Sequence, residues 1–222
     1  MNKCSFPIII LSLLSLILIG SCDKDEKNMV HIAGTVFDPA LNIDVQDASV
    51  VLLAQTIVDG TWSTSFSKQE ETTTDASGAF KFDLEFDYNP AFKLEVEKTD
   101  YFDLEYEIPT ADFVNGTSFT KSFEMYPKGY VSLNIVNVNP VDSNDVITLR
   151  FKDWETSCSG CCFSGFFEFT GDEVNETYEC AVYGEDSYMI EYFVTKKDLG
   201  TTNYSKNFDL DAFQQANISI EY

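Results

Sequence analysis

The chain has 222 residues and is strongly acidic, because 37 Asp and Glu residues against 14 Lys and Arg residues give a formal net charge of -23. A surface of this charge repels phosphate backbones, so the composition excludes nucleic acid as a partner. A single histidine and six cysteines restrict the chemistry that the chain can perform.

The first 21 residues have the layout of a secretory signal peptide, with Lys3 before an apolar run from Phe6 to Ile19. This run is shorter than the about 20 apolar residues that cross a bilayer. Its end resembles the lipobox of bacterial lipoproteins: Ile19, Gly20, Ser21 and Cys22. The resemblance implies cleavage before Cys22 and attachment of lipid to its thiol. The alternative is an ordinary secretory signal followed by a coincidental cysteine.

Residues 22–29 are expected to form the lipidated cysteine and an acidic tether. Asp23, Asp25 and Glu26 alternate with Lys24 and Lys27, and the plainest interpretation is a solvated linker. The tract also resembles the export signal of lipoproteins displayed on the outer face of the outer membrane. We therefore expect an outer-membrane protein anchored by lipid at the cell surface, with the periplasmic face or retention at the inner membrane as alternatives.

Residues 30–127 are expected to form a first β-sandwich domain. Phe80, Phe82 and Leu84 alternate with charged residues, as do Phe92, Leu94 and Val96, which puts one face of each strand in a core and the other in water. Asp59-Gly60, between the runs 54–58 and 61–66, predicts a hairpin turn. No stretch after the signal has a sustained helical period.

This segment resembles the carboxypeptidase regulatory-like domain, a transthyretin-like sandwich. The residues that carry the resemblance are Ile32, Gly34, Val36, Asp38, Ala48, Val50, Leu52 and the turn Thr74-Asp75-Ala76-Ser77-Gly78-Ala79-Phe80, with Phe82 after it. It departs from the family at Gln46-Asp47 and at Thr99-Asp100, where Pro or Gly is common. The resemblance implies an accessory module without chemistry of its own, found on surface lipoproteins and at the start of outer-membrane transporters.

Residues 128–222 are expected to form a second β-sandwich with a cysteine cluster. Three runs show period two: Val131 to Ile135, Ile147 to Phe151, and Ile218 to Tyr222. The last run predicts that Tyr222 is packed. This half resembles an uncharacterised sandwich of similar lipoproteins, and the resemblance implies no function. The fold class is therefore all-β, with two tandem β-sandwich domains after a lipoprotein signal peptide.

The second domain contains the four remaining chemistry-bearing residues after Cys22: Cys158, Cys161, Cys162 and Cys180. An exported compartment favours disulfides. A bond between adjacent cysteines needs a strained ring, so one of Cys161 and Cys162 is expected to join Cys180 and the other Cys158. A zinc site is one alternative, but two adjacent cysteines are awkward ligands for a tetrahedral ion. A redox pair at Cys158 and Cys161 is the other, but such a pair usually lies at a helix start that lowers the pKa of one thiol, and no helix is predicted here.

The side chains available for catalysis argue against an enzyme, and the sequence implies no cofactor. His31 is the only histidine, so a nucleophile–histidine triad or a histidine zinc site has no support, and His31 is expected to be a half-exposed strand residue. Glycoside hydrolysis needs only two carboxylates and stays a remote alternative. The loop residues Asp142 and Asp145 could offer oxygen ligands to calcium, but a turn is the simpler interpretation.

We therefore expect a non-catalytic, lipid-anchored envelope protein that binds or assembles with a surface or outer-membrane protein, for example along an edge strand. The second hypothesis is a glycan-binding surface lipoprotein. Its candidate contacts are Trp62, after the hairpin tip, and Trp154, near the cysteines. A hydrolase is the third.

Overall fold

A computed structural model of the chain describes residues 28–58, 60–86, 90–152 and 161–222, without the side chains of residues 28, 56–58, 62 and 86. The signal peptide, Cys22 and the acidic tract to residue 27 lie outside this range. Nearly all described residues with regular structure are in strands, and their one helix is a 3-10 turn, η1 (Thr110–Asp112). Among the residues described, no helix has the length and apolarity to cross a membrane.

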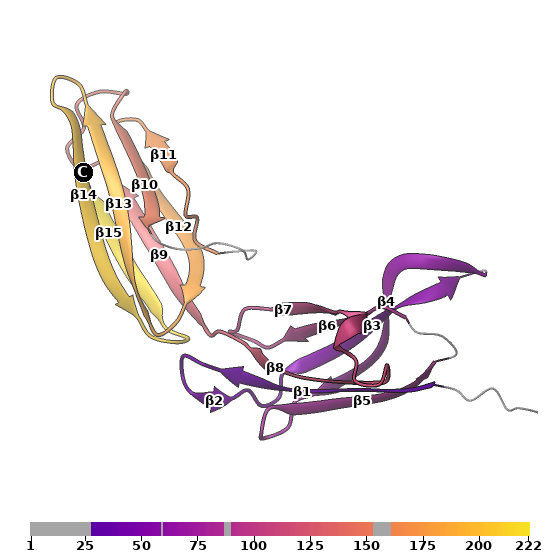
Figure 1. Cartoon of the computed structure of the whole chain (residues 1–222). Coiled ribbons are helices and arrows are strands. Elements are labelled where there is room, and N and C mark those ends of the chain that lie inside the picture. The colour runs from indigo at the N-terminus through magenta and orange to yellow at the C-terminus, as the bar shows by residue number, and fades with distance from the viewer. Residues whose placement is uncertain (1–27, 59, 87–89, 153–160) are drawn as a thin grey trace, which may run out of the picture.

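The first sandwich contains β1 to β8, arranged in two sheets (Figure 1). In one sheet β1 pairs antiparallel with β2 and β5 and parallel with β8, and the other has the order β4-β3-β6-β7. The strands are β1 (Asn28–Asp38), β2 (Ile43–Asp44), β3 (Ser49–Val58), β4 (Thr61–Thr73), β5 (Ala79–Phe86), β6 (Phe92–Glu97), β7 (Leu104–Ile108) and β8 (Ser118–Glu124). This confirms the all-β class for the first half.

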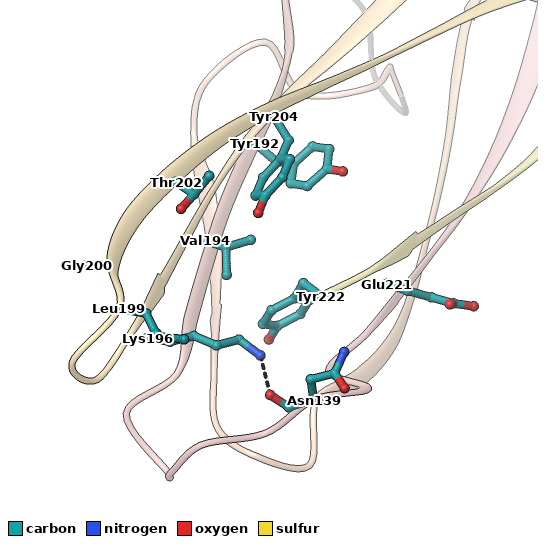
Figure 2. Close-up of a pocket in the computed structure, with 10 residues that line it drawn as sticks. All are labelled: Asn139, Tyr192, Val194, Lys196, Leu199, Gly200, Thr202, Tyr204, Glu221 and Tyr222. Atoms are coloured by element: carbon teal, nitrogen blue, oxygen red, sulfur yellow. Dashed lines mark hydrogen bonds between the residues drawn. The ribbon is translucent and has the colours of Figure 1, made fainter.

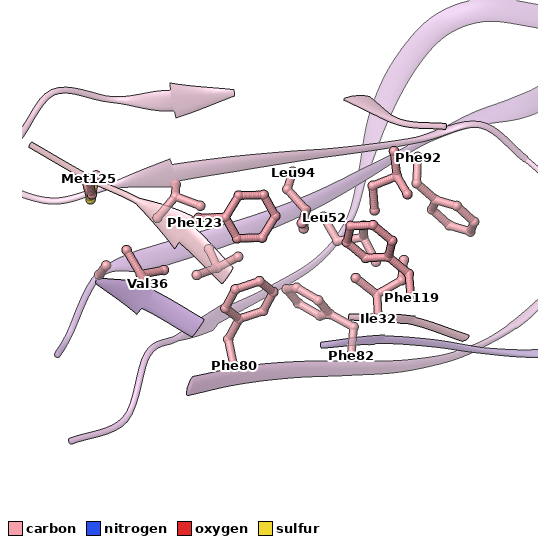
Figure 3. Packing of buried hydrophobic residues seen from close by; sticks show 14 of the residues in the cluster. Ile32, Val36, Leu52, Phe80, Phe82, Phe92, Leu94, Phe119, Phe123 and Met125 are labelled. Atoms are coloured by element: carbon pink, nitrogen blue, oxygen red, sulfur yellow. The ribbon is translucent and has the colours of Figure 1, made fainter. Parts of the chain in front are cut away.

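The core of the first sandwich follows from the alternation in the sequence. Phe80 and Phe82 on β5 face Leu52 on β3 and Leu94 on β6, and all four are buried (Figure 3). Because the period of a strand is two, the charged residues between them lie on the opposite, solvated face. Aromatic rings fill much of the interior, with Phe80 stacked on Phe123 at 6.1 Å between ring centroids.

Two turns of the first sandwich match their sequence signals. Asp75 Oδ1 accepts hydrogen bonds from the backbone N–H groups of Ser77 and Ala79, at 2.8 and 3.0 Å. Gly78 has φ +69°, and a Cβ there would lie 2.3 Å from the carbonyl oxygen of Val36, so only glycine fits. The runs flanking residue 59 pair as the β3–β4 hairpin, which confirms the hairpin, while Asp59 itself is outside the described residues.

The second sandwich contains β9 to β15, also in two sheets. Their orders are β11-β10-β13-β14 and β12-β9-β15, so β14 and β15 are edge strands. The strands are β9 (Lys128–Val136), β10 (Val146–Lys152), β11 (Phe167–Thr170), β12 (Asn175–Tyr183), β13 (Asp186–Lys196), β14 (Gly200–Leu210) and β15 (Gln215–Glu221). Its buried residues form a cluster separate from that of the first sandwich, and Tyr222 is packed as predicted.

An aromatic junction joins the two sandwiches where β8 is followed by β9. The ring of Tyr183 stacks on Tyr126 at 4.7 Å and meets Phe102 edge-on at 5.1 Å, while Phe213 contacts Tyr101 at 5.3 Å. Such ring pairs contribute about 0.5–1.5 kcal/mol each beyond the area that they bury. The junction therefore resists bending of one sandwich against the other. The domain division at residues 127 and 128 stays a prediction.

Candidate functional site

Several residues predicted from the sequence as functional lie beyond what the structure describes. Cys22, Cys158 and Trp154 are outside the described residues, and for Trp62 the structure gives the backbone, in β4, without the side chain. Lipidation of Cys22 and ligand contact by either tryptophan therefore stay predictions.

The cysteine cluster is oxidised where it is described. Cys162 is buried and bonded to Cys180 on β12, 18 residues along the chain, which settles which of the two adjacent cysteines joins Cys180. Cys161 is also disulfide-bonded, and its partner is not among the described residues. A sulfur in a disulfide is not the thiolate that binds zinc, and the Cys162–Cys180 bond ties the segment before β11 to β12. The redox pair at Cys158 and Cys161 stays an untested alternative.

His31 occupies an exposed position on β1, as expected for a strand residue. Its Nδ1 lies 2.5 Å from Asp83 Oδ1, and Lys81 Nζ lies 2.6 Å from Asp83 Oδ2. The bond from Lys81 and then that from His31 hold the pKa of the Asp83 carboxyl below its usual value. Exposed pairs of this kind contribute little to stability. In the part of the chain described, no three His, Cys, Asp or Glu residues gather as metal ligands.

In the loop that carries Asp142 and Asp145, the possible calcium ligands, the positive charge beside Asp145 comes from the side chain of Lys196. Asp145 is fully buried, and its Oδ2 accepts hydrogen bonds from Val141 N–H at 2.8 Å and Asn137 Nδ2 at 3.0 Å. The ammonium of Lys196 lies 3.7 Å from the same oxygen and donates to Asn137 Oδ1 at 3.0 Å and to the carbonyl of Asn139 at 2.5 Å. The carboxylate therefore orders the loop and neutralises a buried lysine.

The pKa of Asp145 reflects two opposing effects. Burial raises it, but the hydrogen bonds from Asn137 and from the backbone of Val141 and Asp142, together with the charge of Lys196, outweigh burial, so the net pKa is lowered. The group is therefore a charged carboxylate at neutral pH, in a sandwich interior that is otherwise apolar. We refer to Asp145, Asn137 and Lys196 as the buried polar group.

A cavity of about 380 Å³ opens beside this group, between the two sheets at the edge formed by β14 and β15 (Figure 2). This volume is at the lower end of the range, about 300–1,000 Å³, of small-molecule sites. Tyrosines supply the aromatic part of the lining, and hydroxyl, amide and ammonium groups supply the polar part. The lining residues are Asn139, Tyr192, Val194, Lys196, Leu199, Gly200, Thr202, Tyr204, Glu221 and Tyr222.

The register of β13 and β14 explains why a core position opens to solvent. Tyr192 pairs with Tyr204 and Val194 pairs with Thr202, and residues paired across strands share one face of the sheet. Val194 is buried in the sandwich interior, so Thr202 and Tyr204 also face inward, yet both are exposed, Tyr204 by 46%. The interior is therefore unsealed along β14.

The tyrosines of the cavity are held in a fixed arrangement. The rings of Tyr192 and Tyr204 stack at 5.2 Å between centroids, with 18° between their planes. Lys196 Nζ lies 5.1 Å from the centroid of the Tyr222 ring. The Tyr222 hydroxyl is buried without a hydrogen-bond partner among the described residues, and burial, followed by the Asp145 charge, raises its pKa to about 12. It is thus a neutral hydroxyl.

Reasoning from the sequence missed this site. The sequence indicated aromatic contacts at Trp62 and Trp154, whereas the structure brings together Tyr192 on β13, Tyr204 on β14 and Tyr222, which follows β15. The segment Gly200–Leu210 alternates only in part, because Thr202 and Lys206 are polar at positions that share the parity of the inward-facing residues. One signal was available: Tyr204 has the same parity as Phe208 and Leu210, which places the three side chains on one face of the strand.

Comparison with known proteins gives no family. No family model matches the chain, and no curated protein matches it. Among solved structures, the Bacillus anthracis TIE protein has 12% identity and a TM-score of 0.35 over 87% of this chain, which spans 34% of that protein. The shaft pilin SpaA of Lactobacillus rhamnosus GG has 9% identity and a TM-score of 0.31, covering 88% of this chain and 97% of the pilin.

A minor pilin of Streptococcus agalactiae has 10% identity and a TM-score of 0.34, covering 86% of this chain and 94% of the pilin. Likenesses of this strength carry no argument about function. The class that the fold and the cavity define is therefore an all-β protein of two sandwiches, with one tyrosine-lined cavity in the second.

Proposed function

We propose that this protein is a non-catalytic binding or assembly module of the cell envelope, anchored by lipid on Cys22 at the outer membrane and displayed at the cell surface. The lipobox resemblance and the acidic tract support the anchor and the address. Resemblance of the first sandwich to carboxypeptidase regulatory-like domains supports an accessory role. The observation that carries the proposal is the pair of sandwiches joined by an aromatic junction, which forms a stiff display unit.

The chemistry of the cavity supports the absence of catalysis. Glu221 is the one carboxylic acid among the residues that line it, whereas hydrolysis of a glycosidic bond needs two carboxyl groups flanking the bond. Lys196 also lines the cavity, but its ammonium is hydrogen-bonded to Asn137 and Asn139. Neither group is paired for general acid–base work.

The partner surface that we favour is the outer edge of β4. This strand is an edge of its sheet, and the β3–β4 hairpin extends beyond the neighbouring strands (Figure 1). Its first seven residues, 61–67, carry no charge, while Lys68, Glu70 and Glu71 follow. Charged side chains protect edge strands from pairing, so the uncharged part is the segment available for strand addition by a partner.

The test uses the full-length lipoprotein, extracted in detergent from its own membrane after cross-linking in the intact cell. We expect one envelope protein to be captured reproducibly, and Thr64→Lys on β4 to abolish that capture. Thr148→Lys, on the inner strand β10, adds the same charge away from any sheet edge and serves as the matched control. Equal capture by both variants would overturn the β4 surface, and no capture by the unaltered protein would overturn a stable partner.

A glycan-binding surface protein is the second candidate function. The observation that favours it is the tyrosine-lined cavity between β14 and β15, which is separate from the β4 edge.

A further inference from the structure

We propose that the cavity between β14 and β15 binds a neutral pyranose ring of a carbohydrate, with Tyr204 as the platform on which the ring lies. The proposal rests on the second candidate function and gives it a site, and it is independent of the partner surface on β4. Three features of the cavity carry it: the presented aromatic face, the surrounding polar groups, and the absence of an available charge that would select an ion.

The aromatic face is preorganised. Tyr204 is 46% exposed although it points toward the sandwich interior, and its ring is supported by the stacked ring of Tyr192 (Figure 2). Tyrosine offers a large, rigid, amphipathic contact area at a low cost in conformational entropy. The ring of Tyr204 therefore presents a flat aromatic face at the mouth of the cavity, and this face suits the apolar C–H face of a sugar ring.

The polar groups of the cavity suit a ligand with many hydroxyls. Thr202 supplies an exposed hydroxyl and Asn139 an amide, whereas the carboxylate of Glu221 points away from Tyr222 and the cavity (Figure 2). The hydroxyl of Tyr222, which is buried at the cavity and has no partner in the described part of the chain, can both donate and accept a hydrogen bond. Small-molecule sites combine an apolar or aromatic surface with a few polar groups of this kind, which fix orientation.

The charges at the cavity disfavour an ionic ligand. An anion would need a free positive charge, but Lys196 is neutralised by Asp145 and hydrogen-bonded to Asn137 and Asn139, and the whole chain has a net charge of -23. A cation would find the ring of Tyr222 already occupied by the Lys196 ammonium, which lies 5.1 Å from the ring centroid. A neutral ring avoids both conflicts.

The opening also does not suit a peptide strand inserted along the edge. Lys206 on β14 donates a hydrogen bond across the gap to the carbonyl of Ser219 on β15, at 2.7 Å. This contact ties the two edge strands together beside the cavity, so a strand running their full length would have to break it. The space that remains is a local cavity, which fits a small ring.

The experiment is saturation-transfer difference NMR on the full-length protein in an alkyl polyoxyethylene ether detergent, which has neither aromatic nor sugar groups. Irradiation at the aromatic frequency saturates tyrosine rings, and the probes are methyl β-D-glucopyranoside, methyl β-D-galactopyranoside and methyl α-D-mannopyranoside. A single ring on one platform is expected to bind with a Kd of about 1 mM. We expect transfer to the C–H protons of at least one of the three sugars.

The decisive variants are Tyr204→Ala and Thr202→Arg. The first removes the platform, and the second fills the mouth of the cavity from an exposed position, so it retains the fold even if the first does not. Both are expected to weaken binding at least tenfold. The matched control is Phe166→Ala, which removes a ring of similar exposure, 48%, that packs on Arg150 away from the cavity, and its binding is expected to be unchanged.

The outcomes separate the site from the function. Equal binding by the parent protein and both cavity variants overturns the site. If binding is instead lost in Trp62→Ala or Trp154→Ala, glycan binding stands but this cavity is not where it occurs. No transfer to any of the three sugars overturns the proposal, as does saturation transfer to tetramethylammonium in their place, which would make the cavity a cation site. Capture of a protein partner through β4 is unaffected by any of these results.

Discussion

The two sandwiches are built from similar alternating strands, but their interiors differ. In the first, aromatic and aliphatic side chains from both sheets seal the core, with Phe82 and Leu52 almost fully buried, and the buried carboxylate of Asp38 lies at the end of β1, where the backbone N–H groups of Ala40 and Leu41 donate to it. In the second, the interior holds Asp145 and Lys196, and it opens to solvent along β14. A buried ion pair contributes little net stability compared with apolar packing. The comparison therefore indicates that the second interior is shaped for more than stability.

The tryptophans allow the two halves to be followed separately, since Trp62 belongs to the first half of the sequence and Trp154 to the second. Fluorescence of the single-tryptophan proteins Trp154→Phe and Trp62→Phe then reports unfolding of each sandwich. The two reporters together therefore measure how far the sandwiches differ in stability.

The largest effect is expected from Asp145→Ala. The substitution leaves the Lys196 ammonium buried without its carboxylate, a change that destabilises by about 3–5 kcal/mol. Urea unfolding should show the loss in the Trp154 signal and little change in the Trp62 signal. Phe82→Ala is the matched control in the first sandwich, because removing a buried phenyl ring also destabilises by about 3–5 kcal/mol but disturbs no charge. Equal losses from Asp145→Ala in both signals would contradict the assignment of this group to the second interior alone.

Asp145→Ala and Phe82→Ala should also differ in how the stability of the second sandwich depends on pH. The pKa of Asp145 is lower in the folded protein than its ordinary value of 3.8, so the unfolded chain binds the proton more readily. The stability that this carboxylate provides is therefore complete above pH 3.8 and is lost as the pH falls through the lower, folded pKa. In acid titrations followed by Trp154, this loss should be absent from Asp145→Ala and present in Phe82→Ala.

The next effect is expected from the disulfide, a covalent link for which the first half of the described chain has no counterpart. Replacing Cys162 and Cys180 by alanine releases a loop closed over 18 residues, which on the chain-entropy account destabilises by about 3 kcal/mol. The Trp154 signal should show this loss in urea without any change in its pH dependence. A loss below about 1 kcal/mol would mean that the remaining contacts of the cysteine loop hold it in place.

Tyr183→Ala tests the junction and so whether the two sandwiches behave as separate units. The substitution removes the stacking on Tyr126 and the edge contact with Phe102, for an expected loss of about 1–3 kcal/mol from two ring pairs. The midpoints reported by Trp62 and by Trp154 should both fall, because the lost contacts belong to both sandwiches, whereas Asp145→Ala lowers mainly the Trp154 midpoint. Unchanged midpoints would show that the junction does not couple the sandwiches.

Most of the strand architecture was predictable because alternation reports which face of a strand is buried, as at Phe80, Phe82 and Leu84. Asp47 and Asp100, where the sequence departs from the resembling family, adopt φ of 57° and 65°, a conformation that Asp tolerates better than most residues. The departures therefore preserve local turns. The buried face of a strand and the position of a turn can be predicted from the sequence because both depend on residues that are neighbours along the chain.

The site was less predictable because it depends on distances between sheets. Asp145 was visible as a loop carboxylate, but its partner Lys196 lies at the end of a strand far along the chain, and nothing local pairs them. Tyr204 lies in a strand of mostly exposed residues that alternates only in part, with Phe208 and Leu210 at the same parity. Its register with Tyr192 shows that it faces inward, and that register is a property of the folded sheet.

The smallest effect is expected from Tyr222→Phe, and its sign distinguishes the open interior from a sealed one. The Tyr222 hydroxyl is buried without a partner among the described residues, and an unsatisfied buried polar group lowers stability. Removing it should therefore raise the stability of the second sandwich by up to about 1 kcal/mol, measured by urea unfolding through Trp154. Tyr188→Phe is the control, because that hydroxyl donates to the carbonyl of Tyr183 at 2.7 Å and its removal should lower stability by a similar amount. If Tyr222→Phe lowers stability instead, the hydroxyl is satisfied in solution by water within the cavity, and the second interior is wet at its open edge.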